Sequence, residues 1–490
     1  MARFGGFTLI TFVGYLIFLL YTCAIMGMGV LLEKTSELDS VLCRKITHVL
    51  SAGLWVICYV FFGFSLHWLI LNLLSTVVLA FTTFSKKVRF FEKDDSKNSI
   101  GLFYFSLSTS IVALVCYFMG EEFYLYTGVA YFCLTLGDGL APIVAKVLEK
   151  HNLSLIPGKS LFGCLTVFIV SVLSTCVFSL VFDMHLPVMM ILSVAGLTCV
   201  AEFYGVKGLD NIMIEFSVFG YMLLYHFDMV SAPLQLVLIL SPFLASVALY
   251  GKILSYSGGI AALWLFTCIG FFSKGFLPIG FITALFLLTG LVALATKKLK
   301  KKHAHKGDHS ARKFKQILAV GLFSLVFLGI YRYSGIWTFK LIFYLSLAEQ
   351  FADSMASDIG SLTKGKNVSI MNFKTVEKGI SGGVSVLGTA SALFASFLIM
   401  VIPLAFGEIG VLTYFVISLI AFIGVMLDSV IGALFQSLYV CDMCNLKTEE
   451  SVHCGQSTRL IKGYRFVDNV SVNFITGLVT CLLGGVLFLI

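Results

Sequence analysis

Long apolar runs constrain this chain more than any other feature of its sequence. Of its 490 residues, 59% are hydrophobic and only 12% are charged. A run of about 20 apolar residues matches the thickness of a bilayer and satisfies its backbone hydrogen bonds there as a helix. The sequence therefore predicts an all-α polytopic membrane protein with about sixteen transmembrane helices. The expected spans begin near Phe7, Val49, Ser65, Ile100, Tyr124, Leu161, Leu186, Ile212, Leu234, Ser257, Gly275, Ile317, Trp337, Ile380, Gly407 and Asn469.

The basic residues alternate between loops in a way that supports this number of spans. All but four of the 34 Lys and Arg residues fall in every second loop. By the positive-inside rule these loops are cytoplasmic, which places both termini outside. The net charge of +8 then reflects topology and does not indicate a nucleic-acid partner. The first apolar run is long and lacks a clear small-residue cleavage site, so no cleavable signal peptide is expected.

The segment from Ala348 to Gly388 has the densest group of polar residues. Glu349 and Asp353 are four residues apart and share a helix face, and Asp358 follows near the helix end. Carboxylates on an apolar helix are costly unless they bind something. Basic, glycine and serine residues come next: Lys364, Lys366, Lys374, Lys378, Gly382, Gly383 and Ser385. Carboxylates for a divalent cation and lysines for phosphate indicate a phosphoryl-handling site, with a tight small-residue helix pair as the alternative.

Polar motifs also interrupt the apolar runs of the first half. Asp138 lies at the end of the fifth span without a counter-ion in its own helix, which makes it a functional candidate. Arg44, Lys45 and His48 lie in the first cytoplasmic loop, where they either anchor the next helix or reach a phosphate. The remaining polar positions are Lys159, Ser160 and Gly163 before the sixth span, Glu202 at the end of the seventh, and Asp210 with Asn211 at the start of the eighth.

The same order of features recurs in the second half, displaced by eight helices. The corresponding positions are Asp353, Gly382 with Gly383, Asp428, and Asp468 with Asn469. An even displacement preserves orientation in the membrane. The sequence therefore predicts two parallel repeats of about eight helices, in domains 1–250 and 251–490, with both sites on the cytoplasmic side.

Two further features belong to the second half alone. The spacing of Asp428, Gly432 and Gln436 places them on one face of a helix, which suits either a metal site or helix packing. A hydrophilic loop then contains four metal-binding residue types: Cys441, Cys444, His453 and Cys454. This set could hold zinc, or the cysteines could be reduced cytoplasmic thiols.

These motifs resemble two known families of membrane enzymes. Residues 41–230 resemble the phytol/dolichol kinases, which use CTP as phosphate donor. The resemblance rests on Arg44-Lys45-x-x-His48, Gly137-Asp138-Gly139, Lys159-Ser160-x-x-Gly163, and Glu202 followed by Asp210-Asn211. Residues 255–490 look like the family that includes phytyl-phosphate kinases, of the DUF92 type. The matching segments are Asp353-Ser354-x-Ala356-Ser357-Asp358, Gly382-Gly383-Val384-Ser385, Asp428 to Gln436, and Asp468-Asn469-x-x-Val472-Asn473.

The resemblance implies a fusion of two consecutive isoprenoid kinases. The first half would phosphorylate a prenyl alcohol such as phytol or geranylgeraniol, and the second would convert the monophosphate to the diphosphate. CTP would be the donor, with Mg²⁺ or Mn²⁺ as cofactor. The implied catalytic residues are Asp138, Asp353, Asp358, Asp428 and His48, the four aspartates also being metal ligands; Arg44, Lys45, Lys159, Lys364 and Lys378 would bind phosphate. A lipid cytidylyltransferase, similar to CDP-diacylglycerol synthase, and a secondary transporter are the alternatives.

Overall fold

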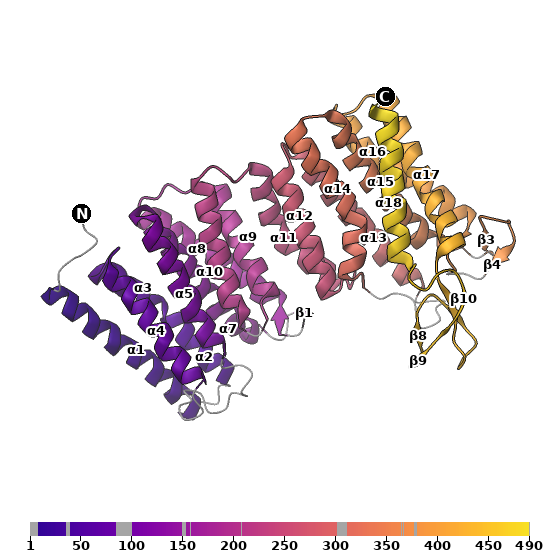
Figure 1. The fold of residues 1–490 in the computed structure, drawn as a ribbon. Coiled ribbons are helices and arrows are strands. Elements are labelled where there is room, and N and C mark those ends of the chain that lie inside the picture. The colour runs from indigo at the N-terminus through magenta and orange to yellow at the C-terminus, as the bar shows by residue number, and fades with distance from the viewer. Residues whose placement is uncertain are drawn as a thin grey trace. The chain divides into compact units, whose positions relative to one another are not determined.

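Helices account for most of the structure, a computed structural model shown in Figure 1. It describes residues 8–35, 40–84, 100–148, 153–156, 158–206, 208–300, 311–363, 365, 367–376 and 380–489. The chain divides into two units, residues 1–246 and 247–490. The division falls within α11 (Ala232–Tyr250), and the domain boundary expected at residue 250 lies at the end of that helix.

Unit 1 is built from helices with one small hairpin. Its elements are α1 (Leu9–Thr35), α2 (Ser40–Leu50), α3 (Ala52–Phe61), α4 (Leu66–Phe84), α5 (Ile100–Met119), the 3₁₀-helix η1 (Glu121–Phe123), α6 (Tyr124–Phe132), the π-helix η2 (Cys133–Asp138), α7 (Gly139–Val147), β1 (Ser154–Ile156), β2 (Lys159–Ser160), α8 (Leu161–Val181), α9 (Val188–Tyr204), α10 (Leu209–His226) and α11 (Ala232–Tyr250). β1 and β2 pair antiparallel directly before α8.

Unit 2 adds short strands at the ends of its helices. Its elements are α12 (Tyr256–Phe272), α13 (Leu277–Lys300), α14 (Phe314–Ser334), α15 (Trp337–Gly360), β3 (Asn367–Ser369), β4 (Thr375–Val376), β5 (Gly383–Val384), α16 (Val386–Ala405), α17 (Val411–Phe435), β6 (Leu438–Val440), β7 (Lys447–Thr448), β8 (Val452–His453), β9 (Gln456–Ser457), β10 (Arg459–Lys462) and α18 (Asn469–Leu489). The strands form antiparallel sheets in the orders β4-β3-β5, β10-β6-β7 and β8-β9.

The helices have the length and composition of membrane spans. Twelve of the described helical segments are long and apolar enough to cross a bilayer. α9 and α12 are apolar but have only 17 residues each, and α10 and α15 carry charged residues. The all-α polytopic fold is therefore confirmed. Every expected span coincides with a helix, while the number that crosses the membrane stays a prediction.

In each unit a segment with a predicted acid is packed against five or six helices. In unit 2, α15 packs against α13, α14, α16, α17 and α18, and every residue from Lys340 to Ala352 is buried. In unit 1, η2 packs against α2, α6, α7, α8, α9 and α10. A charged group at such a position pays a desolvation cost and needs a partner there.

Candidate functional site

Asp138 lies at an irregular point of the fifth expected span. This segment is α-helical in α6, π-helical in η2 and α-helical again in α7. Pro142 in α7 has no N–H and cannot donate the helical hydrogen bond to the Asp138 carbonyl. π-helical turns within α-helices often occur at functional sites. The surrounding helices leave Asp138 only 1% exposed.

Helix α2 supplies the counter-charge that Asp138 lacks in its own helix. Lys45 forms an ion pair with Asp138 Oδ1, and His48 Nε2 lies 3.5 Å from Asp138 Oδ2. Lys45 and His48 are three residues apart and share a helix face. Their expected position in a loop is wrong, because α2 begins at Ser40 and includes them. Arg44 is half-buried on the same helix.

Lys159 connects two further carboxylates. It forms an ion pair with Glu202 of α9, and its Nζ lies 3.4 Å from Asp210 Oδ2 of α10. Burial alone would lower the pKa of Lys159, but the charges of Glu202, Asp210 and Asp138 outweigh burial and raise that pKa. Lys159 therefore stays protonated near neutral pH.

The three carboxylates converge on one point. Asp138, Glu202 and Asp210 each place one oxygen within 4.8 Å of the other two. Among the described residues, Asp138 Oδ2 and Glu202 Oε2 are buried and form no hydrogen bond, with His48 Nε2 lying 3.5 Å from the former. Buried acceptors without partners are costly, and oxygen ligands of this kind suit a hard divalent cation. Asp138 was predicted as a metal ligand, and the structure brings Glu202 and Asp210 into the same group.

The remaining first-half motif residues hold the ends of neighbouring helices. Ser160 caps α8 by accepting a hydrogen bond from the Gly163 N–H at 3.2 Å. Asn211 Nδ2 donates to the Gly101 carbonyl at 2.9 Å, which ties α10 to α5. Both contacts fix the backbone around the three carboxylates.

The predicted acids of unit 2 come from α15 and α17. Glu349 is 1% exposed and accepts a hydrogen bond from Gln350 at 2.6 Å, while Asp428 accepts one from Thr476 of α18 at 3.3 Å. Glu349, Asp353 and Asp428 are close enough for their negative charges to repel one another. In the part of the chain that the structure describes, Asp353, Asp358 and Asp428 do not all lie within 4.8 Å of one another. The second cluster is therefore wider than the first.

Arg312 is a cation of unit 2 that was not predicted from the sequence. Its guanidinium donates to Ser354 Oγ at 3.2 Å, and its charge acts on Asp353. Its carbonyl accepts hydrogen bonds from the N–H and the hydroxyl of Ser255, both at 3.0 Å. A Cβ on Gly258 would lie 2.1 Å from the same carbonyl, so this contact requires glycine. Arg312 thus joins the start of α12 to the acids of α15.

The glycine-rich segment lies against the end of α17. Gly382 has φ of +78°, and a Cβ on it would lie 2.3 Å from Ala433 Cβ. Gly383 belongs to β5, which pairs with β3. Ser385 caps α16 by accepting from the Gly388 N–H at 3.1 Å. The fourteenth helix therefore begins at Val386 and not at the expected Ile380. The predicted phosphate-binding residues Lys364 and Lys378, and Lys366 beside them, lie outside the described residues.

Glu449 is a second residue that was not predicted. Its Oε1 accepts from the N–H and the hydroxyl of Ser381, at 3.0 and 2.5 Å, and its Oε2 accepts from Gln436 Nε2 at 2.7 Å. Gln436 was expected on the Asp428 face of a helix, but α17 ends at Phe435 and Gln436 has extended backbone. Glu449 therefore connects the loop after α17 to the glycine-rich segment.

The last predicted motif is mainly a helix cap. Asp468 Oδ1 accepts hydrogen bonds from the N–H and the hydroxyl of Ser471, both at 2.8 Å. Asp468 and Asn469 are exposed, and Asn473 is half-buried. Asp468 thus stabilises the start of α18 as a helix cap.

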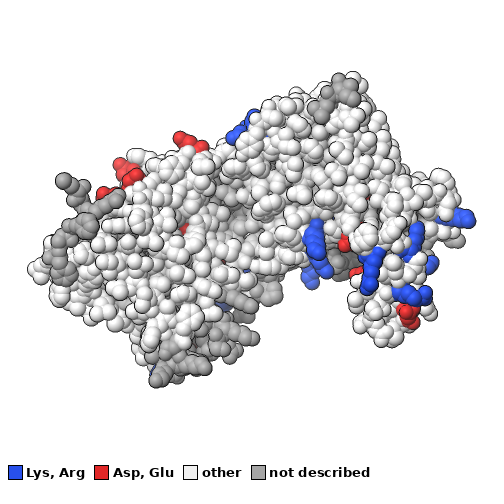
Figure 2. Space-filling view, in the orientation of Figure 1, with Lys and Arg blue, Asp and Glu red and all other residues white. Residues whose placement is uncertain are grey.

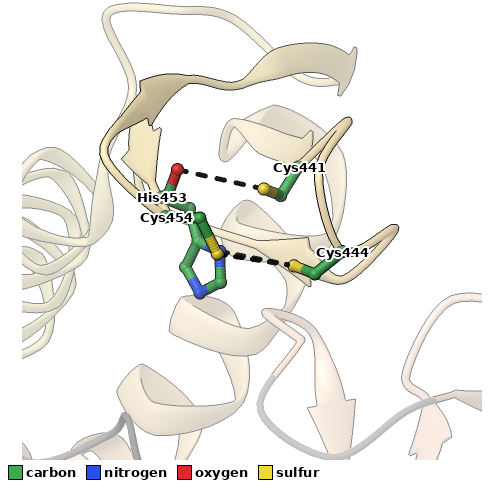
Figure 3. Close-up of side chains that lie close together, drawn as sticks. All are labelled: Cys441, Cys444, His453 and Cys454. Carbon is green, nitrogen blue, oxygen red and sulfur yellow. Dashed lines mark hydrogen bonds between the residues drawn. The ribbon is translucent and has the colours of Figure 1, made fainter.

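The loop between α17 and α18 contains the predicted Cys and His residues. Cys441, Cys444, His453 and Cys454 each place one ligand atom within 4.8 Å of the others (Figure 3). Hydrogen bonds, the largest contribution coming from His453, lower the pKa of the Cys441 thiol to about 6. Lys and Arg side chains gather around this end of unit 2, while most of the helical surface in view is uncharged (Figure 2). The exposed basic residues of the loop are Lys447, Arg459, Lys462 and Arg465.

Comparison with known proteins gives a family match for the second half of the chain. Residues 239–481 match the family described as "Integral membrane protein DUF92". An uncharacterized membrane protein of Methanocaldococcus jannaschii is 34% identical over 164 residues, covering 33% of this chain and 66% of that protein. No solved structure matches.

Two proteins of Arabidopsis thaliana are more distant relatives. Protein PGR is 29% identical over 145 residues, covering 27% of this chain and 49% of PGR. Protein VTE6, chloroplastic, is 29% identical over 191 residues, covering 37% of this chain and 56% of VTE6. The chain thus spans about half to two thirds of the length of the curated relatives it matches.

Proposed function

We propose that this protein is a kinase that phosphorylates a membrane-embedded isoprenoid alcohol to the monophosphate and then to the diphosphate, with CTP as donor. The observation that carries the proposal is that each unit has carboxylates, a basic side chain and a serine-capped helix start: a buried group of three carboxylates in unit 1, and buried Glu349 with partly buried Asp353 and Asp428 in unit 2. The family match over residues 239–481 supports the prenyl-phosphate step for unit 2. The motif resemblance of residues 41–230 to phytol/dolichol kinases supports the alcohol step for unit 1.

Unit 1 would carry out the first transfer. The alcohol oxygen attacks the γ-phosphorus of CTP, the bond from that phosphorus to the β–γ bridging oxygen breaks, and CDP leaves. In the part of the chain that the structure describes, His48 Nε2 has no hydrogen-bond partner and lies beside Asp138, so it is placed to accept the hydroxyl proton. Lys45 and Lys159, which are paired with carboxylates, are the cations available to phosphate oxygens.

Unit 2 would carry out the second transfer, which needs no strong base. A monophosphate oxygen attacks the γ-phosphorus of a second CTP, a phosphoanhydride bond forms, and CDP leaves. The second pKa of a phosphate monoester is about 6, so the nucleophile is mostly deprotonated near pH 7. Positive charge is needed instead, and Arg312, the N-terminus of α16, Lys364 and Lys378 are the proposed sources.

A divalent cation, Mg²⁺ or Mn²⁺, fits the carboxylates. In unit 1 three carboxylates face two lysines, and Asp138 Oδ2 and Glu202 Oε2, which form no hydrogen bond among the described residues, offer hard ligands. In unit 2 the proposed ligands are Asp353, Asp358 and Asp428. Such an ion, when bound, neutralises charge on the transferring phosphoryl group.

The architecture suits a substrate with two different ends. A long prenyl chain stays in the bilayer, while CTP reaches the carboxylates from water. Both clusters are therefore proposed to face the cytoplasm, as the positive-inside rule predicts.

The test is an assay with the purified full chain in detergent. It uses γ-labelled CTP and a panel of prenyl alcohols and monophosphates, with products identified by mass spectrometry. The proposal expects addition of one and then two phosphoryl groups, with CDP as co-product, and no turnover by an Asp138→Asn/Asp353→Asn double variant. Transfer of a cytidylyl group with release of diphosphate would identify a lipid cytidylyltransferase, and the absence of any nucleotide-dependent product would favour a transporter; either result overturns the proposal.

A further inference from the structure

We infer that Cys441, Cys444, His453 and Cys454 form a structural zinc site. The closest ligand atoms are Cys454 Sγ and His453 Nδ1 at 3.2 Å, Cys444 Sγ and His453 Nδ1 at 3.5 Å, and the sulfurs of Cys444 and Cys454 at 3.9 Å (Figure 3). Tetrahedral ligands at 2.0–2.3 Å from zinc lie about 3.3–3.8 Å from one another. The ligand atoms of Cys444, His453 and Cys454 thus have close to the spacing of a zinc site, and Cys441 Sγ lies within 4.8 Å of each of them as the fourth ligand.

Local backbone geometry turns all four residues toward this point. His453 and Cys454 are adjacent, and neighbours on an extended strand would face opposite sides. Cys454 has φ of +51° and Gly455 has φ of +78°, so the chain reverses there between β8 and β9. The Cys441–Cys444 turn is closed by the Asn445 N–H donating to the Cys441 carbonyl at 2.7 Å.

Apart from the sheet β10-β6-β7, the part of this loop around the four ligands has only short strands and exposed apolar side chains. β7, β8 and β9 have two residues each, and the apolar side chains of Met443, Leu446 and Val452 are more than half exposed. A segment without a hydrophobic core needs a disulfide or a metal ion to be stable. By contrast, Cys116 and Cys133 in the helices of unit 1 are buried among apolar residues and need no ligand.

The zinc site would position Glu449, which lies in the chain between the two ligand pairs. Glu449 holds both Ser381, next to Gly382, and Gln436, at the end of α17. The metal thus fixes the conformation of a residue that supports the glycine-rich segment. This consequence rests on the proposed function of unit 2, whereas the zinc site itself does not.

The experiment measures metal content of the full chain by inductively coupled plasma mass spectrometry after purification without chelators. One zinc ion per chain is expected in the wild type and in Cys23→Ser, a control at an exposed cysteine of α1. Cys444→Ser and Cys454→Ser should lose zinc, and trypsin should cut them faster at Lys447 and Arg459. Glu449→Gln should keep its zinc.

A second measurement keeps the inference testable if these variants fail to fold. Mercurial titration of the folded wild type should release one zinc ion, detected by a chromogenic chelator. A wild type without zinc, a disulfide between Cys444 and Cys454, another metal in the site, or unchanged zinc in both serine variants would overturn the assignment. None of these results depends on whether the chain is a kinase.

Discussion

Replacing Lys159 by methionine should destabilise unit 1 strongly. Lys159, Glu202 and Asp210 have side chains that are 19%, 7% and 14% exposed, so the ion pairs are largely shielded from water. Removing one partner of a buried pair costs about 3–5 kcal/mol, because the other charge is left uncompensated. Here the loss leaves Glu202 and Asp210 facing each other and Asp138.

This cost corresponds to a measurable change in melting temperature. For a domain of 150–250 residues, 1 kcal/mol shifts the midpoint by about 2–4 °C, so Lys159→Met should lower it by about 6–20 °C. Thermal unfolding in detergent, followed by intrinsic fluorescence, measures the shift. Lys159→Arg is the matched control, because it keeps the charge and should lose much less.

Two further measurements test whether the lower midpoint of Lys159→Met is caused by the uncompensated charges of the carboxylates. Lys159→Met/Glu202→Gln should be more stable than Lys159→Met, because it removes one of the uncompensated carboxylates. Added Mg²⁺ should raise the midpoint of Lys159→Met more than that of the double variant. A shift below about 2 °C in Lys159→Met, or a double variant less stable than the single one, would refute the assignment of Lys159 as the charge partner.

Three other outcomes follow from the structure. Gly382→Ala should lower the thermal midpoint, because a residue other than glycine in the left-handed backbone conformation costs about 1–2 kcal/mol and the new Cβ would lie 2.3 Å from Ala433 Cβ. The control Gly280→Ala, which has open space around the new Cβ, should leave the midpoint nearly unchanged. Equal shifts in the two variants would contradict this prediction. EDTA should abolish nucleotide-dependent turnover and Mg²⁺ should restore it, whereas turnover that survives chelation would exclude the metal assignment. In intact cells of a Cys23→Ser background, an impermeant thiol reagent should label Glu121→Cys and miss Lys462→Cys, and the reverse pattern would invert the predicted topology.

The helical membrane fold could be predicted because apolar runs and alternating basic loops are local features of the sequence. Each expected span coincides with a helix, although caps shift some of the ends. Ser385 delays the start of α16, and Gln436 falls just beyond α17. Cap geometry depends on one hydrogen bond, which hydrophobic periodicity does not reveal.

The charge partners were harder to predict because they are distant in the chain. Asp138 pairs with Lys45, 93 residues earlier, and the guanidinium of Arg312 reaches Ser354, 42 residues later. Glu449 stands in a hydrophilic loop with no motif to distinguish it from an ordinary solvated acid. Intramembrane acids such as Asp138 and Asp353 were found because a charge in an apolar helix is unusual.

The central claim, two sites with different substrates, is tested most directly by comparing Asp138→Asn with Asp353→Asn in the purified protein. Each change removes one carboxylate from one cluster, and the loss of a charge that stabilises phosphoryl transfer should cost several kcal/mol, enough to nearly stop that step.

The measurement is the ratio of prenyl monophosphate to diphosphate formed from labelled CTP, with either the alcohol or the monophosphate supplied. Asp138→Asn should fail to phosphorylate the alcohol and still convert supplied monophosphate, and Asp353→Asn should make monophosphate that accumulates. If both folded variants lose both steps to the same extent, the two units form one composite site and the account of two kinases is wrong.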